Sequence, residues 1–391
     1  MGEVGFMITN EKKELNVVFS EEFIKKLPGV DNFYNPSVVV LGKYNTSQSI
    51  KLREQVERWF CLLPDKCKAD IKARLRSLNN KIHDSGFYEL LFHQYFLEEG
   101  WKVEKDPVVD GLTPDFSIIT DNSLKFYAEV FGLYKTKDAE EKDKNFRVIL
   151  RALNNIKSQF LLSFNLKTWF QEKIFIKKFT QDVKAWIDSL PLGKGVHFEK
   201  EFNSGGIRAL VGAIWVGEAE RSNNICTHGG PAGSIDVPVS KIKDLMYRKL
   251  KKYKFVKKIK LPFVLVVSTD DLFFAEKAVD WSLYGLDVIS FPVDNPNKEA
   301  KFHKDNSGFI TPNPGLYGRP ENKGLSAVIL VKKNWNFGDV VYDMKVYHNP
   351  WALNPLPEDV FSKMPQFIKQ SGPPGHITLG WKNEGKVVIF S

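Results

Sequence analysis

The stretch TPDFSIITDNSLKFYAEVFG, residues 113–132, decides the fold because it reads as two short strands joined by a tight turn. Polar and apolar residues alternate on both sides of TDNSL, which is typical of a half-buried β-hairpin. With Asn122 at the centre of the turn, residues pair when their numbers add up to 244. Asp115 then lies directly opposite Glu129, with the two Cβ atoms roughly 4.5–5.5 Å apart.

This register gives the two faces of the hairpin different characters. The apolar face carries Phe116, Ile118, Phe126, Ala128 and Val130. The opposite face carries Asp115, Ser117, Lys125, Tyr127 and Glu129. A shift of one residue would place the two acids on opposite faces, so the alternation supports the pairing. We expect the first face to contact the core and the second to present carboxylates.

Two facing carboxylates repel each other unless a cation lies between them, and strands disfavour Asp in any case. Mg²⁺ or Mn²⁺ fits, because Mg²⁺ takes one or two carboxylates together with waters and phosphate oxygens. The alternative is an exposed strand face without a ligand. Glu89 is a candidate third acid: it shares a helix face with His93, four residues later, although that face is equally compatible with solvent exposure.

Helices and strands are interleaved along the rest of the chain. Residues 49–80 predict two amphipathic helices separated near Pro64, and Asp84 is expected to cap a third helix that Gly100 ends. A hairpin is predicted around NSGG, at 203–206. Further on, SKIKDLMYRKLKKYK predicts a helix and LPFVLVV a buried strand. The order indicates an α/β (α+β) protein with a mixed sheet.

Composition and charge narrow the class of protein. The 391 residues are 43% hydrophobic, no window approaches the roughly 18 apolar residues of a membrane span, and three cysteines form no disulfide framework. A cytoplasmic protein without a membrane partner is therefore expected. The net charge is +9, and RKLKKYKFVKKIK, residues 248–260, holds eight basic residues and no acidic one. Such a block favours nucleic acid, although a solvated helix face would look the same. The residues expected to contact the phosphate backbone are Arg248, Lys251, Lys252, Lys254, Lys257 and Lys258.

The order of a Glu-bearing helix, a strand, TPDFSII, a turn and FYAEV resembles the PD-(D/E)XK (restriction-endonuclease-like) nuclease superfamily, and more narrowly a group of uncharacterised bacterial endonuclease-like proteins. The likeness covers roughly residues 50–360 and includes FYELLFHQYFLEEGWKVEKDP, the LKKYK–LPFVLVV pair, LSAVILV and YHNPWALNPLP. It implies a mixed sheet flanked by helices, Asp115 and Glu129 as ligands of Mg²⁺ or Mn²⁺, and Glu89 as the acid that assists them.

The resemblance also divides the chain. It implies a helical N-terminal segment at 1–80 and a first half of the core at 81–134. An α/β insertion follows at 135–239, and residues 240–391 hold the second half of the core and a C-terminal extension. LPFVLVV would be the fourth core strand, and the helix before it the second core helix.

The family's usual lysine, two residues after the glutamate, is replaced by Phe131. Lys125 shares the carboxylate face but lies four residues along the strand, roughly 13 Å away. Lys249 is a better candidate, because it falls within the apolar stripe of the second core helix, where a buried cation needs an anion. The alternative is that Lys249 extends its ammonium group to solvent from the edge of the stripe.

The resulting expectation is a metal-dependent endonuclease-type phosphodiesterase that acts on DNA. Asp115, Glu129 and Glu89 would hold the metal, and Lys249 would stabilise charge on the phosphate. A homodimer is compatible with the sequence. The rival reading is a catalytically decayed nuclease fold that binds nucleic acid or regulates, which Phe131 favours and the retained acid pair disfavours. A third reading is an interaction module without metal binding.

Overall fold

The computed structural model describes residues 17–31, 35–169, 173–193, 196–217, 225–229, 239–253, 260–269, 275–290, 301–305, 307–311, 322–336, 339–370 and 378–383. Its helices are α1 (Glu21–Lys26), α2 (Ser37–Lys43), α3 (Ser47–Cys61), α4 (Asp65–Leu75), α5 (Asn80–Glu98), α6 (Lys137–Asn154), α7 (Ile176–Asp188), α8 (Val239–Lys252) and α9 (Ala275–Tyr284). No helix in this part of the chain combines the length and the apolar character needed to cross a membrane.

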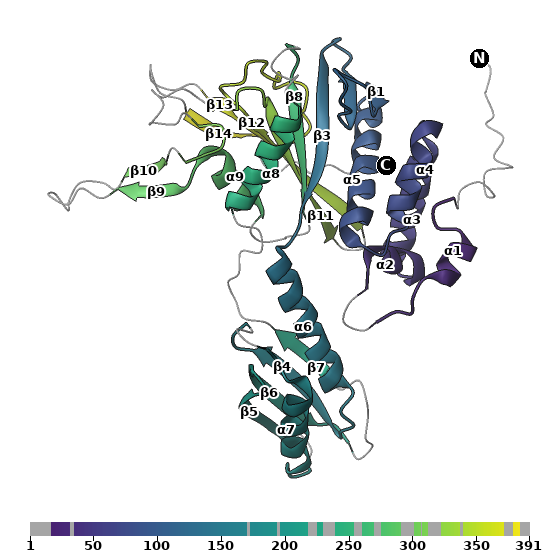
Figure 1. Ribbon diagram of the computed structural model, residues 1–391, viewed down its shortest axis with the longest axis vertical. Coiled ribbons are helices and arrows are strands. Elements are labelled where there is room, and N and C mark those ends of the chain that lie inside the picture. The colour runs from purple at the N-terminus through teal and green to yellow at the C-terminus, as the bar shows by residue number, and fades with distance from the viewer. Residues whose placement is uncertain are drawn as a thin grey trace. The chain divides into compact units, whose positions relative to one another are not determined.

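Two compact units divide the chain. The first contains Met1–Val30, Asn35–Tyr134 and Val237–Ser391, and the second contains Asp31–Tyr34 and Lys135–Asp236. The predicted α/β class is confirmed, because the first unit is a large mixed sheet with helices on both faces (Figure 1).

The large sheet has the strand order β1-β2-β3-β8-β11-β12-β13-β14. Its strands are β1 (Lys102–Lys105), β2 (Phe116–Ile119), β3 (Lys125–Leu133), β8 (Phe263–Thr269), β11 (Ala327–Asn336), β12 (Asp339–His348), β13 (Gln366–Gln370) and β14 (Thr378–Lys382). β3, β8 and β11 run parallel, and β1, β2 and β3 form an antiparallel meander at one edge. A separate hairpin consists of β9 (Asp287–Ser290) and β10 (Lys301–Lys304).

The predicted register of the hairpin is confirmed. Phe116 pairs with Ala128, and Ser117 pairs with Tyr127. One step further along the same register, Asp115 lies opposite Glu129, just before β2 begins. β3 also pairs with β8, from Tyr127 opposite Phe263 to Leu133 opposite Thr269. The strand that precedes the second unit in the chain is therefore a neighbour of the strand that follows it.

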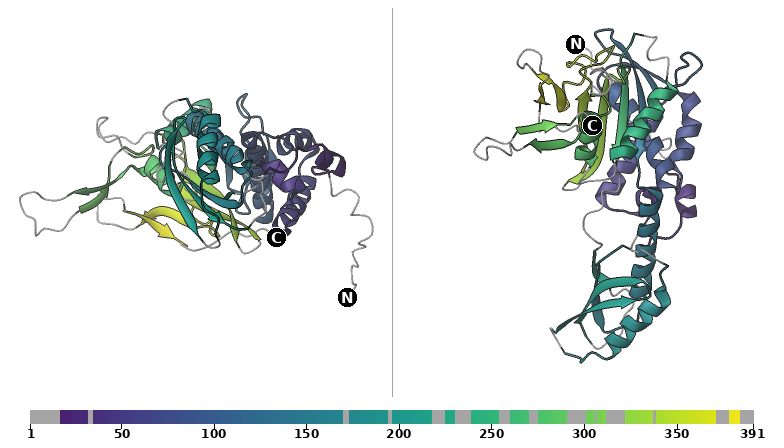
Figure 2. Two further views of the ribbon diagram at one scale, coloured as in Figure 1. Left: turned by 90° about the horizontal axis from the view of Figure 1, so that it is seen from below. Right: turned by 60° about the vertical axis from the view of Figure 1, so that its left-hand side comes forward.

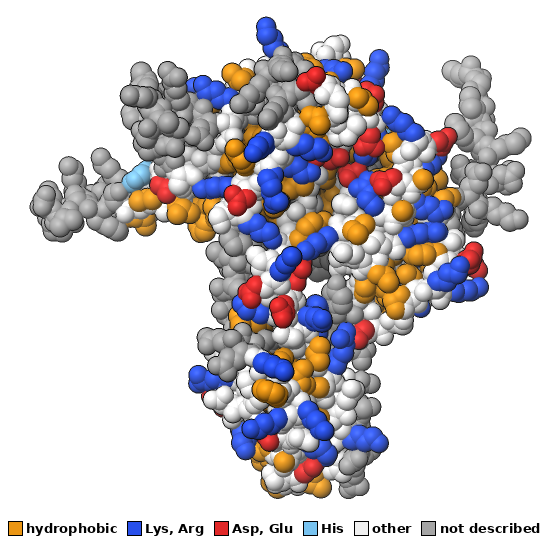
Figure 3. All heavy atoms as spheres, viewed as in Figure 1, with side chains coloured by type: hydrophobic (Ala, Val, Ile, Leu, Met, Phe, Trp, Pro, Cys, Tyr) orange, Lys and Arg blue, Asp and Glu red, His pale blue; other side chains and the backbone are white. Residues whose placement is uncertain are grey.

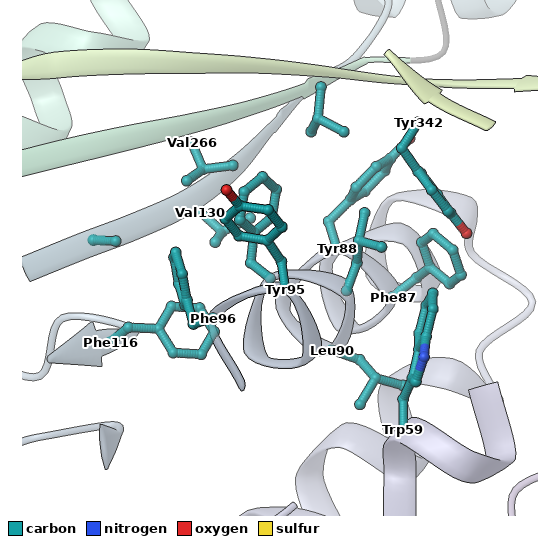
Figure 4. Packing of buried hydrophobic residues seen from close by; sticks show 14 of the residues in the cluster. Trp59, Phe87, Tyr88, Leu90, Tyr95, Phe96, Phe116, Val130, Val266 and Tyr342 are labelled. Atoms are coloured by element: carbon teal, nitrogen blue, oxygen red, sulfur yellow. The ribbon is translucent and has the colours of Figure 1, made fainter. Parts of the chain in front are cut away.

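Helix α5 is the centre of the first unit. Every residue from Phe87 to Phe96 is buried, because the helix lies between the sheet and helices α3 and α4. Phe96 contacts Phe116 of the sheet, with ring centroids 5.5 Å apart, whereas Phe87 contacts Trp59 of α3 at 6.4 Å (Figure 4). The helix is thus buried on almost every side, and its buried residues include the polar Glu89, His93 and Gln94. Any polar group on it therefore needs a partner inside the protein.

The expected cap of α5 is wrong. The helix begins at Asn80, and the side chain of Asn79 caps it by accepting from the N–H of Lys81. Asp84 lies inside the helix and is buried. An Asp followed by an apolar periodic run is a typical start signal, but an earlier Asn supplies the same cap and the NKIH turn extends the helix. Gly100 ends the helix as expected, with a φ of 80°.

The second face of the sheet is covered by α8 and α9, on the side opposite α5 (Figure 1). Ile242 and Met246 are the buried apolar residues of α8, and Tyr253 follows directly after its end. The sheet thus separates two cores, one against α5 and one against α8.

The second unit has its own core and its own sheet, of order β5-β6-β4-β7, packed against α6 and α7 (Figure 2). The strands are β4 (Phe160–Leu166), β5 (His197–Ser204), β6 (Ile207–Trp215) and β7 (Ile225–Gly229). The hairpin predicted at NSGG is confirmed: β5 and β6 are antiparallel, and Gly205 and Gly206 take φ values of 58° and 75° that L-residues rarely adopt.

Candidate functional site

Asp115 directly precedes β2, and Glu129 lies in the middle of β3. The N–H of Asp115 donates to Oε2 of Glu129 at 3.3 Å, and Oδ2 of Asp115 accepts from the N–H of Val130 at 2.7 Å. Glu129 is 2% exposed, and Asp115 is half-buried. The backbone therefore fixes both carboxylates against each other in a largely dehydrated place.

Helix α8 brings a lysine to this pair. Nζ of Lys249 lies 2.6 Å from Oε1 of Glu129, although its side chain is still 29% exposed. Lys249 thus reaches an anion while its side chain stays partly exposed, and its role in the site remains a prediction. One helical turn later, the hydroxyl of Tyr253 donates to Oε2 of Glu129 at 2.6 Å. Both oxygens of Glu129 are therefore held from α8.

Phe131 lies two residues after Glu129, where the resemblance implies a lysine. Its side chain is buried on the α8 side of the sheet, and Nζ of Lys249 lies 5.9 Å from the centre of its ring. An ammonium group at this distance from an aromatic face is weakly attracted by the ring. The ring of Phe131 therefore lies beside the ammonium group of Lys249.

Glu89 occupies the other side of the sheet. Its Oε1 accepts from one guanidinium nitrogen of Arg74 at 2.6 Å, and its Oε2 from the other at 2.8 Å. This fork-on-fork pairing joins α4 to α5. It depends on the close approach of the two helices at Gly86, where a Cβ would lie 2.9 Å from Cβ of Arg74.

A second lysine, Lys105, joins Glu89 at the end of β1. Its Nζ lies 2.7 Å from Oε2 of Glu89 and 2.7 Å from Oδ1 of Asp106. It also lies 5.2 Å from the ring centre of Phe116, its partner on β2. The side chain is 1% exposed, which a lysine tolerates only when it is paired.

The charges around Asp115 act on its protonation. Burial raises the pKa of the Asp115 carboxyl well above its usual range, and the negative charges of Glu89 and Glu129 add to this effect. Burial lowers the pKa of the Lys105 ammonium group, but the negative charges of Glu89 and Asp115 have the larger, opposite effect, so this pKa is raised. On the α8 side, burial and the charge of Glu129 raise the pKa of Tyr253, so the phenol keeps its proton and donates.

The donor set fits a hard cation at Asp115 and Glu129. Oxygen ligands, facing carboxylates and an excess of negative charge at Asp115 are what Mg²⁺ or Mn²⁺ would relieve. Within the described ranges, no group of three or more His, Cys, Asp and Glu side chains is placed to hold a metal ion. A cation here would accordingly take two protein carboxylates, and its other ligands would be waters and phosphate oxygens.

Part of the expected phosphate-contacting set lies on α8. Arg248, Lys251 and Lys252 are exposed, and Figure 3 shows Lys and Arg side chains gathered over this helix. Lys252 also reaches the site, since its Nζ donates to the hydroxyl of Tyr253 at 2.7 Å. Lys254, Lys257 and Lys258 lie outside the described residues.

Sequence reasoning missed three residues that hold the acids. Tyr253 continues the apolar stripe of α8, yet its spacing of four residues from Lys249 is the signal that both reach one group. Lys105 follows Trp101 and Val103 at strand spacing, which puts a lysine on the buried face of β1. Arg74 carries no such signal, because a basic residue on an amphipathic helix is ordinary.

Comparison of the chain with protein-family models, with curated proteins and with solved structures gives no match.

Proposed function

We propose that the protein is a metal-dependent endonuclease-type phosphodiesterase that acts on DNA, with a restriction-endonuclease-like core of the PD-(D/E)XK kind. One observation carries the proposal: Lys249 meets Glu129 beside Asp115, so α8 provides the lysine that Phe131 replaces on the strand. Two facing acids destabilise a sheet by their repulsion, so their presence beside a partly exposed lysine supports a role in binding a cation and a phosphate.

Asp115 and Glu129 are the residues that would hold Mg²⁺ or Mn²⁺. When bound, such a cation polarises the phosphate and increases the acidity of a coordinated water. Tyr253 holds Oε2 of Glu129 and thereby fixes the plane of this carboxylate. Because Lys249 is partly exposed, its ammonium group is available to a phosphate oxygen, where it would stabilise the charge that develops in the transition state.

The substrate class follows from the charge of α8. Arg248, Lys251 and Lys252 are exposed on the helix that also carries Lys249. Lysine and arginine side chains on one helix contact successive phosphates of a nucleic acid and release its counterions, which supplies most of the non-specific affinity. A strand of DNA held along α8 would thus place a phosphate near Lys249.

A specific observation favours the second candidate, a decayed nuclease fold that binds nucleic acid. Both oxygens of Glu129 and both of Glu89 already accept hydrogen bonds from protein donors. The two acids are therefore neutralised without a metal ion, as a purely structural network would require.

Cleavage of plasmid and of single-stranded DNA, in Mg²⁺, Mn²⁺ and EDTA, separates these candidates. We expect metal-dependent cleavage that Asp115→Asn and Glu129→Gln abolish. Asp121→Asn, an exposed acid in the turn of the same hairpin, serves as the matched control and should cleave normally. Salt-dependent DNA binding without cleavage would favour the decayed fold, and the absence of both would exclude both candidates.

A further inference from the structure

We propose that Glu89 is the buried counter-ion of Lys105 rather than a metal ligand, and that Lys105 is a positioning residue for Asp115. This inference rests on the proposed function and assigns the two sides of the site different tasks. It departs from the role that the sequence implies for Glu89.

Both glutamates accept from protein donors on both oxygens, but Glu89 pairs with two cations and Glu129 with one lysine at hydrogen-bond distance. Arg74 takes both oxygens of Glu89, and Lys105 shares Oε2 at 2.7 Å. A metal ligand at this position would have to release at least one of these bonds. Releasing Glu89 would leave Arg74 with only Asp70 and Lys105 with only Asp106, so each cation would lose the buried one of its two acidic partners, which is unfavourable.

Lys105 is tied to Asp115 through the backbone as well as through charge. Its strand neighbour Asp106 donates its N–H to the carbonyl of Asp115 at 3.0 Å. Asp106 takes a φ of 52°, a left-handed conformation that Asp tolerates, and its side chain accepts from Nζ of Lys105. The residue that follows β1 is therefore hydrogen-bonded to the residue that precedes β2. The ammonium group of Lys105 connects this contact to Glu89, because it pairs with both Asp106 and Glu89.

The two lysines of the site differ in exposure. Lys105, on the α5 side, is 1% exposed, and Lys249, on the α8 side, is 29% exposed. The first is surrounded by protein groups and cannot reach a substrate. The second has an accessible ammonium group. Positioning is thus assigned to Lys105 and contact with the phosphate to Lys249.

A charge-removal cycle tests this assignment. The variants are Lys105→Met, Glu89→Gln and the double variant, with Lys102→Met, at the exposed start of the same strand, as control. Mn²⁺ binding is measured by equilibrium dialysis, thermal unfolding without metal gives the stability, and the Mn²⁺ dependence of cleavage gives kcat and the apparent metal constant separately.

Each single variant breaks the Glu89–Lys105 pair: Lys105→Met leaves Glu89 with Arg74 alone, and Glu89→Gln leaves Lys105 with Asp106 alone. We expect both to lower Tm and to weaken Mn²⁺ binding at least about 10-fold, the loss that follows when a group supporting a ligand is removed. The double variant should bind Mn²⁺ as Lys105→Met does, because Glu89 acts on the metal only through Lys105, and its loss of Tm should be smaller than the sum of the two single losses. Lys102→Met should change neither quantity.

Three outcomes would overturn the inference. If Glu89 is itself a ligand, Glu89→Gln will weaken Mn²⁺ binding further in the Lys105→Met background, and the two losses will add. If Lys105→Met binds and cleaves as the wild type does, Lys105 has no positioning role. If the wild type binds no Mn²⁺, the proposed function fails, and additive Tm losses in the cycle would then also exclude the counter-ion pair.

Discussion

Lys249 and Glu129 form an ion pair of 2.6 Å, although 120 positions of the chain separate them. The acid is on the third strand of the sheet and the lysine is on a helix that begins only after the whole second unit. Glu129 is buried and Lys249 is partly exposed, so the pair joins a fixed carboxylate to an ammonium group that solvent and ligands can reach.

Substitution of Lys249 should separate metal binding from turnover. We expect Lys249→Ala to lower kcat about 100-fold or more, since a charge-stabilising donor is lost from the transition state. Mn²⁺ affinity should stay equal or increase, because the ammonium group no longer competes for Oε1 of Glu129. Single-turnover cleavage and equilibrium dialysis measure the two effects, and Lys277→Ala, at an exposed lysine of α9, should leave both near the wild type.

We expect the Asp115 carboxylate to lower the stability of the metal-free protein, and a bound metal ion to reverse this loss. Its carboxyl lies near the charges of Glu89 and Glu129, so Asp115→Asn should raise Tm in EDTA by about 2 °C, the shift that about 1 kcal/mol produces in a sizeable domain. Saturating Mn²⁺ should raise the Tm of the wild type and leave the variant unchanged. A variant that is less stable than the wild type in EDTA would contradict this view of the site.

Tyr253→Phe should loosen Glu129 while leaving the core intact. The ring of Tyr253 packs on Phe263, 5.4 Å between centroids, and phenylalanine keeps this contact. The lost hydroxyl leaves Oε2 of Glu129 without a strong donor, which costs about 1–3 kcal/mol. Urea unfolding should show this loss together with weaker Mn²⁺ binding. An unchanged metal affinity would mean that Lys249 alone positions Glu129.

The exposed basic residues of α8 predict a salt effect. Removing the charges of Arg248, Lys251 and Lys252 together should weaken DNA binding, and it should reduce the slope of log K against log salt by about 1 for each phosphate contact that is lost. Fluorescence anisotropy with a labelled duplex at several salt concentrations measures this slope. Loss of affinity with an unchanged slope would indicate misfolding rather than lost phosphate contacts.

His83 predicts a loss of stability in acid. Burial lowers the pKa of this imidazole to about 4, whereas in the unfolded chain it titrates near 6.5. Between these values the unfolded state binds more protons, so stability decreases as the pH falls from about 6.5 to about 4 and is unaffected by this group above that range. The full effect is about 3 kcal/mol.

The measurement is urea unfolding at several pH values, with His83→Gln as the comparison. The glutamine can keep a hydrogen bond to the carbonyl of Leu75, which His83 contacts at 2.7 Å, and it does not titrate. The variant should therefore be less sensitive to pH between 4 and 6.5. Parallel curves for the two proteins would show that His83 does not contribute.

The sequence predicts those parts of the fold that follow from the alternation of apolar residues in strands, from their 3.6-residue spacing in helices and from local turn residues. The hairpin register, the break at Pro64 and the end of α5 at Gly100 all follow from local signals. The start of α5 was not predictable, because Asn79 and Asp84 are both good caps and only tertiary packing selects the earlier one. Burial of the whole helix then makes the extra turn favourable.

The candidate site was predictable where one helix or one hairpin carries its residues. Asp115, Glu129 and Lys249 could be proposed because each stands out against a regular apolar pattern. The partners of Glu89 could not, because Arg74 and Lys105 reach it from two other elements whose packing no local pattern specifies. Long-range ion pairs of this kind depend on the tertiary fold alone.

The place of the second unit in the chain makes the protein suited to fragment complementation. Its two ends are close, since Nζ of Lys241 donates to the carbonyl of Tyr134 at 2.6 Å. A cut within residues 135–236 would leave Glu129 on one fragment and Lys249 on the other, with the β3–β8 ladder as the surface that rejoins them. Neither fragment alone would contain a complete site, so any activity would report reassembly of the two halves.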